Sequence, residues 1–362
     1  MHLFPSLEKV YTQDRLSARD AQRLAEFIAF GPIVFQVSRL MLKSGILERL
    51  RSRPQSLQEL SKEAGLSEYA AKVLLEASLS IGTVIIDKDD KFHLSKTGWF
   101  LLTDPATRVN VDFNHDVNYE GFFRLEESLK EGRPAGLEHF GPWPTLYEGL
   151  SSLPKQVQDS WFAFDHFYSD HSFDEALPIV FAAHPRKIMD VGGNTGRFAQ
   201  RCVVYDKDVE VTIVDLPQQL ELMRKATADD PEAVRIHGHA ADMLNPSAEF
   251  PADLHPDVIW MSQFLDCFSE PQILSILQRA AKVMGKKSRL LIMETFWDRQ
   301  KYEPAAFCLT MTSVYFTVMA NGNSKMYHSD DMARLVKEAG LEVESIKDGL
   351  GQGHSIMICK KI

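Results

Sequence analysis

A glycine-rich segment, KIMDVGGNTGRFAQRC at residues 187–202, holds the residues whose types and spacing most clearly predict chemistry. An apolar run typical of a strand ends at Asp190, and a helical segment begins after three glycines, Gly192, Gly193 and Gly196. Glycines let the backbone pass close to a ligand, and a helix N-terminus favours polar or anionic groups. Asn194 tolerates left-handed geometry, so it replaces a glycine, and the segment departs from the GxGxxG pattern. The carboxylate before the glycines would repel a pyrophosphate and favours a ligand with an ammonium group.

Two more carboxylates follow the next two apolar runs, Asp215 in VTIVDLP and Asp242 in HAADMLNP. In an open parallel sheet the ligand lies outside the carboxyl ends of the strands, so we expect the three acids at one binding edge. Asp215 suits the two ribose hydroxyls of an adenosine, Asp242 suits the adenine amino group, and Met243 suits the ring face. Each aspartate taken alone has a second interpretation, because strand-end aspartates often cap the next helix. An adenosine with an amino-acid tail and no phosphates is S-adenosylmethionine, and the constellation predicts a site for it.

The elements that must position these residues form an α/β pattern. From residue 186 onward, short β-rich runs alternate with helical segments, which is typical of a mostly parallel sheet with crossover helices. The last two runs, LEVESIKD and HSIMICKK, have no helix between them, so one of the two strands should be antiparallel.

The N-terminal third has the pattern of a winged helix. Residues 19–51 carry apolar residues at helical spacing. A capping-box pattern at Ser56 begins a helix that ends at Gly65, and Ser67 begins another that ends at Gly82. TVIIDKDDKFHL then predicts two strands around an acidic tip. The module binds DNA in one interpretation and serves structure or dimerisation in the other. The acidic tip and the formal net charge of −10 favour the second, without a nucleic-acid partner.

Composition narrows the class of protein. A chain of 362 residues predicts two domains. The four cysteines are widely separated and form no CxxC pair, as expected of reduced thiols in a cytoplasmic protein. The first residues carry charges and lack the apolar core of a secretory signal, and no run of about 18 apolar residues predicts a membrane-spanning helix. We expect no metal, because no cluster of histidines and acids has ligand spacing.

The segments DVGGNTG, VDLP, HAADM, FLDCFSEPQILSIL and RLLIMET resemble those of the S-adenosylmethionine-dependent O-methyltransferases of the hydroxyindole and plant caffeic-acid type, which have bacterial members. The resemblance covers nearly the whole chain. It implies a Rossmann-like catalytic domain with a seven-stranded sheet at residues 109–362, whose residues 109–185 form a helical connector. It also implies a winged-helix dimerisation domain at residues 1–108 and hence a homodimer.

The resemblance also implies roles for individual residues. The expected cofactor-binding residues are Asp190, Gly192, Gly193, Gly196, Asp215, Leu216, Asp242, Met243, Ser262, Tyr168 and Ser172. The expected acceptor pocket is lined by Phe164 and by a stripe at four-residue steps, Phe307, Met311 and Tyr315. Ordinary core packing is the alternative for these aromatic side chains.

One departure from the family concerns the catalytic base. The family usually reads LHDWSDE where this chain has LDCFSEP, so Asp266 occupies the place of the histidine that deprotonates the acceptor. Glu294 matches the acid that supports this histidine, whereas Met326 falls where a second acid is expected. Ser269 and Gln272 form a capping-box pattern, which leaves Asp266 without a capping role.

Asp266 therefore has two interpretations. An exposed aspartate is a poor base, but burial and a nearby Glu294 would raise its pKa into a useful range. Alternatively Asp266 only positions a loop or the cofactor, and the base is unnecessary or is one of three histidines, His166, His171 and His328.

The function predicted from these residues is S-adenosylmethionine-dependent methylation of a small aromatic or polyketide-like acceptor, with O-methylation favoured and C- or N-methylation left open. A non-catalytic protein that senses S-adenosylmethionine or a metabolite is the rival, because the usual histidine is missing. A nicotinamide-dependent enzyme is disfavoured, because the loop lacks GxGxxG and retains Asp190.

Overall fold

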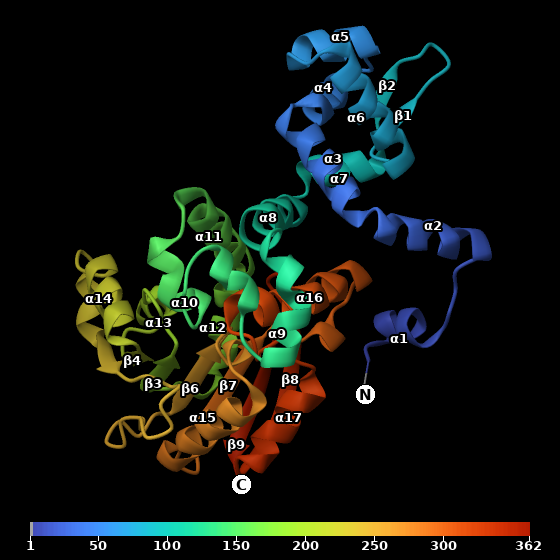
Figure 1. The fold of residues 1–362 in the computed structure, drawn as a ribbon. Helices are drawn as coiled ribbons and strands as arrows, with labels where there is room; N and C mark the ends of the chain where they lie inside the picture. The colour runs from blue at the N-terminus through green and yellow to red at the C-terminus, as the bar shows by residue number, and fades with distance from the viewer. Residues whose placement is uncertain (1–2) are drawn as a thin grey trace. The chain divides into compact units, whose positions relative to one another are not determined.

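The structure is a computed structural model that describes residues 3–362. The chain divides into two compact units (Figure 1). The smaller comprises residues 14–117 and 159–164, and the larger comprises residues 3–13, 118–158 and 165–362. Within the described residues no single helix has the length and apolar character to cross a membrane, although α2 and α3, bent by 76° at their junction, meet these criteria as a pair.

The smaller unit contains the predicted helix-turn-helix and hairpin. Its elements are α2 (Ala18–Ala29), α3 (Gly31–Lys43), α4 (Ile46–Ser52), α5 (Leu57–Ala64), α6 (Glu68–Ile81), β1 (Val84–Ile86), β2 (Phe92–Leu94), α7 (Lys96–Thr103) and α8 (Pro105–Phe113). The capping box at Ser56 is present, and Gly82 ends α6 at φ 91°. Strands β1 and β2 pair antiparallel, with Ile85 opposite His93. These local predictions are confirmed.

The larger unit is built on a seven-stranded sheet in the order β5-β4-β3-β6-β7-β9-β8. The strands are β3 (Lys187–Val191), β4 (Glu210–Asp215), β5 (Ile236–Ala240), β6 (Val258–Ser262), β7 (Arg289–Glu294), β8 (Leu341–Leu350) and β9 (His354–Lys361). The first five strands of this order are parallel, and β9 pairs antiparallel with both β7 and β8. The expected fold class and the antiparallel strand near the C-terminus are therefore confirmed.

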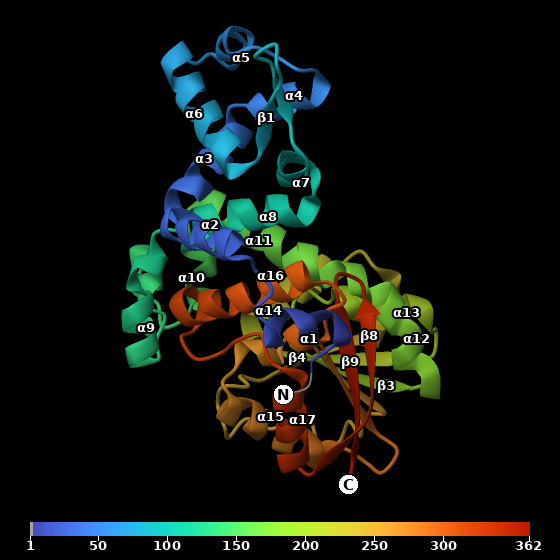
Figure 2. The same cartoon turned by 90° about the vertical axis from the view of Figure 1, so that its right-hand side faces the viewer.

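Helices cover both faces of this sheet (Figure 1). One face packs against α12 (Phe173–Val180), α13 (Arg197–Tyr205) and α14 (Pro217–Ala226), and the other packs against α15 (Glu270–Val283) and α17 (Ser329–Glu338). The N-terminal helix α1 (Pro5–Thr12) belongs to this unit (Figure 2). The ring of Tyr11 meets the ring of Trp297 edge-on, with their centroids 6.2 Å apart.

The remaining segments are mostly helical. They include η1 (Asn114–Asn118), η2 (Gly121–Arg124), α9 (Leu125–Glu131), η3 (Ala135–His139), α10 (Leu146–Gly149), η4 (Leu150–Ser152), α11 (Lys155–Ser169), η5 (Asp170–Ser172), η6 (Phe181–Ala183), η7 (Pro231–Arg235), η8 (Leu265–Cys267), η9 (Trp297–Arg299), α16 (Glu303–Tyr315) and η10 (Phe316–Ala320). The elements that matter for the site are α10, η8 and the end of α16.

Candidate active site

The glycine loop joins β3 to α13 in a backbone conformation that only some residues adopt. Gly192, Asn194 and Gly196 have φ values of 77°, 50° and 82°. Such left-handed values favour glycine and, among other residues, asparagine. The prediction that Asn194 replaces a glycine is confirmed at the level of the backbone.

Two glycines of this loop approach their neighbours so closely that a side chain would not fit. A Cβ atom on Gly193 would lie 2.6 Å from Oδ2 of Asp190. A Cβ atom on Gly192 would lie 2.4 Å from the ring of Phe264, which follows β6. The loop therefore lies against the Asp190 carboxylate on one side and against the segment that carries Asp266 on the other.

Asp190 is a buried acid with an unused oxygen. Its side chain is 2 % exposed, and Oδ2 has no hydrogen-bond partner among residues 3–362. Burial, reinforced by the nearby Asp215, raises the pKa of Asp190 to about 8. A buried carboxylate without a partner is costly, and a cationic ligand would offset that cost. This atom fits the ammonium group expected from the sequence.

Asp215, at the end of β4, closes the glycine loop. Its Oδ2 accepts a hydrogen bond from the Asn194 amide at 2.8 Å, and its Oδ1 accepts one from the Leu216 amide at 2.7 Å. Burial raises the pKa of Asp215, and these two amides oppose the rise. Asp215 thus organises the loop and the start of α14 through its own oxygens.

Asp242 and Met243 follow β5, the next strand of the sheet. Asp242 is exposed and accepts a hydrogen bond from the Leu244 amide at 2.9 Å, whereas Met243 is 6 % exposed. The buried Arg279 of α15 holds this segment by donating to the Met243 carbonyl at 2.7 Å and to two later carbonyls. The order β5-β4-β3 therefore brings the three strand-end acids to one edge, as expected.

The other expected cofactor residues are more dispersed. Ser262 ends β6, which pairs with β3 on the side away from β4. Ser172 is fully buried in η5, next to Gly351, and Tyr168 on α11 is half-buried with its ring 5.2 Å from Phe167. Phe164 belongs to the smaller unit, where its ring stacks on Phe113 at 3.9 Å. That stacking favours the packing alternative for Phe164.

Asp266 lies in η8, between β6 and α15. The capping box of Ser269 and Gln272 begins α15 as predicted. The Asp266 side chain is 5 % exposed, and burial raises its pKa to about 7. A hydrogen bond from the Cys267 thiol opposes this rise, and the charge of Asp165 adds to it.

Glu294 stands at the end of β7 and holds the backbone of the Asp266 segment. Its Oε1 accepts hydrogen bonds from the amides of Leu265 at 2.9 Å and Phe264 at 3.2 Å. Its Oε2 is buried and has no partner within the described chain. Burial, followed by the charge of Asp266, raises the pKa of Glu294 well above its usual range. The two carboxyl groups share one buried site, where only one negative charge is easily held.

The residues of the apolar stripe on α16 differ in how far they are exposed to solvent. Phe307 and Met311 are 54 % and 49 % exposed, whereas Tyr315 is buried. The α-helix ends at Tyr315 and continues as the π-helical turn η10, which changes the periodicity. Met319, one further step along, is fully buried, and its sulphur would meet a Cβ atom on Gly121.

The three alternative histidines make local contacts. His328 is buried and caps α17 by accepting from the Asp330 amide at 3.0 Å. His166 lies 3.3 Å from a guanidinium nitrogen of Arg197, and His171 lies 3.0 Å from the Phe167 carbonyl. These contacts give each histidine a structural role that does not involve Asp266.

Three residues near Asp266 were missed in the sequence. Tyr327 donates to the Phe268 carbonyl at 2.6 Å, and Asn321 donates to the Cys267 carbonyl at 2.7 Å. The hydroxyl of Tyr147 donates to the sulphur of Cys267 at 3.3 Å. No local pattern marks Tyr147, Asn321 and Tyr327, because they approach η8 from distant segments.

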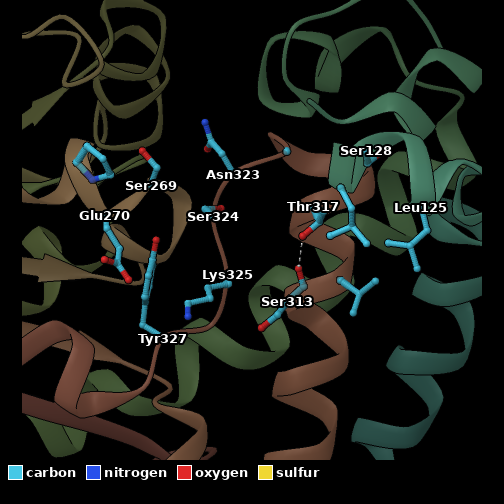
Figure 3. A pocket seen from close by; sticks show the side chains of 14 residues that line it. Leu125, Ser128, Ser269, Glu270, Ser313, Thr317, Asn323, Ser324, Lys325 and Tyr327 are labelled. Atoms are coloured by element: carbon cyan, nitrogen blue, oxygen red, sulfur yellow. Dashed lines mark hydrogen bonds between the residues drawn. The ribbon is translucent and has the colours of Figure 1, made fainter. Parts of the chain in front are cut away.

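A pocket of about 590 Å³ lies beside the same segment. Figure 3 shows its walls, which are formed by α9, the start of α15, the α16–η10 region and the loop at residues 322–327. Ser269 and Tyr327 belong to these walls, whereas Asp266 and Glu294 do not.

Comparison with known families matches both parts of the chain. Residues 173–342 match the model of an O-methyltransferase domain, and residues 22–92 match that of a Dimerisation2-like domain.

Curated relatives align over most of the chain. Demethylspheroidene O-methyltransferase of Cereibacter sphaeroides is 22% identical over 95% of this chain and 87% of that protein. Mitomycin biosynthesis 6-O-methyltransferase of Streptomyces lavendulae is 23% identical over 85% of each chain.

Solved structures share the fold. The S-adenosylmethionine-dependent methyltransferase SibL has a TM-score of 0.70 at 24% identity, covering 92% of this chain and 98% of its own. NcsB1, an O-methyltransferase from neocarzinostatin biosynthesis, has a TM-score of 0.64 at 19% identity, covering 91% and 96%.

Proposed function

Since the chain belongs to the S-adenosylmethionine-dependent O-methyltransferases, we propose that it methylates a hydroxyl group on a small aromatic or polyketide-like acceptor. By their names, two relatives act on demethylspheroidene and in mitomycin biosynthesis. The NcsB1 structure contains S-adenosylmethionine together with 2-hydroxy-5-methyl naphthoic acid. The observation that carries the proposal is the buried carboxyl pair of Asp266 and Glu294, next to a loop that packs directly on the glycine loop.

The residues at the edge of the sheet suit the cofactor. The unpartnered Oδ2 of Asp190 would receive the ammonium group of its methionine part. Asp215 would hold the ribose hydroxyls, and Asp242 with Met243 would hold the adenine. Leu216, Ser262, Tyr168 and Ser172 complete the proposed set. When bound, the cofactor supplies a methyl group that is made electrophilic by its sulfonium.

Asp266 is the proposed base. A phenol with an ordinary pKa near about 10 gains from a group that accepts its proton, and a base works best when its pKa is near the operating pH. Burial raises the pKa of Asp266 to about 7, which meets this condition. Asp266 would take the acceptor proton on its carboxylate, and Glu294 would keep the segment in place through the amides of Phe264 and Leu265.

Proximity supplies the rest of the catalysis. The Gly192 backbone and the Phe264 ring are in contact, so the segment that carries Asp266 is fixed relative to the glycine loop. Holding two reactants in a reactive geometry contributes several kcal/mol to lowering a barrier. In this proposal a single carboxylate base, combined with this positioning, carries the reaction at the place where the sequence resemblance implies a histidine.

We also propose a homodimer in the cytoplasm. The smaller unit contains the Dimerisation2-like domain, and α2, α3 and the junction between them expose the apolar side chains of Phe27, Ile28, Phe30 and Ile33. Phe307 and Met311 on α16 are also exposed, but we assign them to the wall of the acceptor pocket and not to the dimer interface. The four cysteines are thiols and not disulfides, as is usual in a reducing compartment.

The experiment is a transfer assay with methyl-labelled S-adenosylmethionine and a panel of hydroxylated aromatic and polyketide compounds. Each phenol is paired with its own methyl ether, which lacks the hydroxyl group. Label on the phenols alone is expected. Equal label on the ethers would indicate C- or N-methylation, and label on neither would refute the proposed acceptor class.

The role of Asp266 is tested with the same assay. Asp266→Asn removes the base but preserves the shape of the side chain, and we expect turnover to fall about 10²-fold or more at neutral pH. Undiminished turnover would refute Asp266 as the base. A variant that binds S-adenosylhomocysteine like the wild type shows that the loss concerns chemistry and not folding.

A further inference from the structure

The backbone around Asp266 is fixed from three sides, which leaves only its side chain to be positioned. Glu294 accepts from the Leu265 amide, Asn321 donates to the Cys267 carbonyl, and Tyr327 donates to the Phe268 carbonyl. Glu294 ends β7, whereas Asn321 and Tyr327 belong to the loop between η10 and α17, so two segments distant from η8 in the sequence hold it. A base held this way still needs a defined rotamer to meet an acceptor hydroxyl.

The side chain of Asp266 has a donor in its neighbour. The Cys267 thiol donates to Oδ1 of Asp266 at 3.5 Å, and the Tyr147 hydroxyl donates to the Cys267 sulphur at 3.3 Å. Each of the two hydrogen bonds is thus donated toward Asp266, from phenol to sulphur and from thiol to carboxylate. The two contacts link phenol to thiol to carboxylate, in a hydrogen-bonded series of three residues.

Tyr147 is itself held in place. It lies on the short helix α10, and the ring of Trp143 packs so closely on Gly149 that a Cβ atom there would lie 2.3 Å from it. The Tyr147 side chain is 38 % exposed, so the residue reaches from the protein surface to the sulphur of Cys267.

We propose that Cys267 and Tyr147 are positioning residues for Asp266, in which the thiol orients the carboxylate and the phenol orients the thiol. The inference rests on the proposed function, because it gives the Asp266 base its geometry. Other titratable groups also interact electrostatically with Asp266, Cys267 or Tyr147, namely Asp165, Glu294, Tyr315 and Tyr327. Burial raises the pKa of the Cys267 thiol well above its usual range, so the thiol remains protonated and can donate.

The first test needs no acceptor. Alkylation of Cys267 by iodoacetamide is followed by peptide mass spectrometry at pH 8.5, with the half-buried Cys308 as an internal control. Asp266→Asn removes a negative charge beside the thiol and should speed its alkylation about fivefold or more, because a thiolate forms more easily. Tyr147→Phe removes a donor to the sulphur and should slow it about twofold or more. Cys308 should be unchanged.

Equal rates of Cys267 alkylation in the wild type and both variants would overturn the proposed hydrogen bonds between Tyr147, Cys267 and Asp266. So would changes of the same sign in both variants, because these would report altered access and not hydrogen bonding. An equal change in the alkylation rate of Cys308 would also indicate altered access to the thiols and not a change in hydrogen bonding.

The second test uses the pH profile of methyl transfer. Cys267→Ala removes the donor to Asp266, so the acid limb of kcat/KM should move to higher pH, whereas Cys267→Ser keeps a donor and should stay near the wild type. If kcat/KM falls by the same factor at every pH in both variants, Cys267 has only a structural role, and the proposal is overturned. If alkylation shows the expected opposite changes but no phenol is methylated, the hydrogen bonds between Tyr147, Cys267 and Asp266 are supported and the proposed acceptor class is refuted.

Discussion

Cofactor binding should release a proton from Asp190, and lowering the pH should therefore weaken it. The free protein holds this carboxyl with a pKa of about 8, through burial and the charge of Asp215. A bound ammonium group requires the ionised form, since Oδ2 has no other partner among residues 3–362. Below pH 8 part of the binding free energy is consumed in removing the proton.

The magnitude follows from this pKa. At pH 6.5 about 3 % of the sites are ionised and at pH 8.5 about 76 %, so the affinity should fall about 25-fold between the two. At pH 7 binding should release about 0.9 of a proton. The Cys202 thiol, whose pKa burial and Asp190 raise well above its usual range, stays protonated in this window.

The assay is calorimetric titration with S-adenosylhomocysteine at pH 6.5, 7 and 8.5, in buffers of different ionisation enthalpy. Asp190→Asn should bind about tenfold or more weakly at pH 8.5, since a hydrogen bond to a charged group contributes about 1.5–3 kcal/mol. Its affinity should not depend on pH. Asp242→Asn, a matched exposed carboxylate at the same edge, should weaken binding but keep the pH dependence. A flat wild-type profile, or a full pH dependence in Asp190→Asn, would refute the reasoning.

Three further perturbations follow from single contacts. His354 is fully buried, with both ring nitrogens lacking partners in the described chain, and burial lowers its pKa to about 4, so the unfolded state binds its proton more tightly. Urea unfolding should show that His354→Leu abolishes a stability loss of about 2–3 kcal/mol between pH 7 and pH 4.5. Arg279→Met leaves three carbonyls without their donor, and thermal unfolding should show about 2–4 kcal/mol of destabilisation with weaker S-adenosylhomocysteine binding; unchanged affinity would contradict this. A Cβ atom on Gly98 would lie 2.1 Å from the Thr83 carbonyl oxygen, so Gly98→Ala should destabilise the smaller unit by about 1–3 kcal/mol, whereas Gly31→Ala, with nothing within 4 Å, should not.

The features that could be predicted from the sequence are those set by short stretches of chain. The left-handed backbone of Asn194, the capping boxes at Ser56 and Ser269, and the hairpin at β1 and β2 all depend on residues a few positions apart. The alternation of strands and helices was also sufficient to predict the parallel sheet, because a helix between two strands returns the chain so that the second strand runs parallel to the first. A common edge for Asp190, Asp215 and Asp242 followed directly.

The stripe on α16 shows where local periodicity stops being informative. Four-residue spacing places Phe307, Met311 and Tyr315 on one helix face, but it does not say what covers that face. Tyr315 is buried while Phe307 and Met311 are exposed, and the π-helical turn that follows shifts the register.

The sequence by itself determined the type of chemistry, because glycines, strand-end acids and their order along the chain encode a cofactor edge. Only the tertiary structure decided the hydrogen-bond partners, and hence the pKa, of each acid. Asp190 lacks a partner, Asp215 is bonded by two amides, and Asp266 lies beside the thiol of Cys267, which in turn is bonded by Tyr147. The physical reason is that a pKa depends on burial and on neighbours within a few ångströms, and folding brings those neighbours from distant positions.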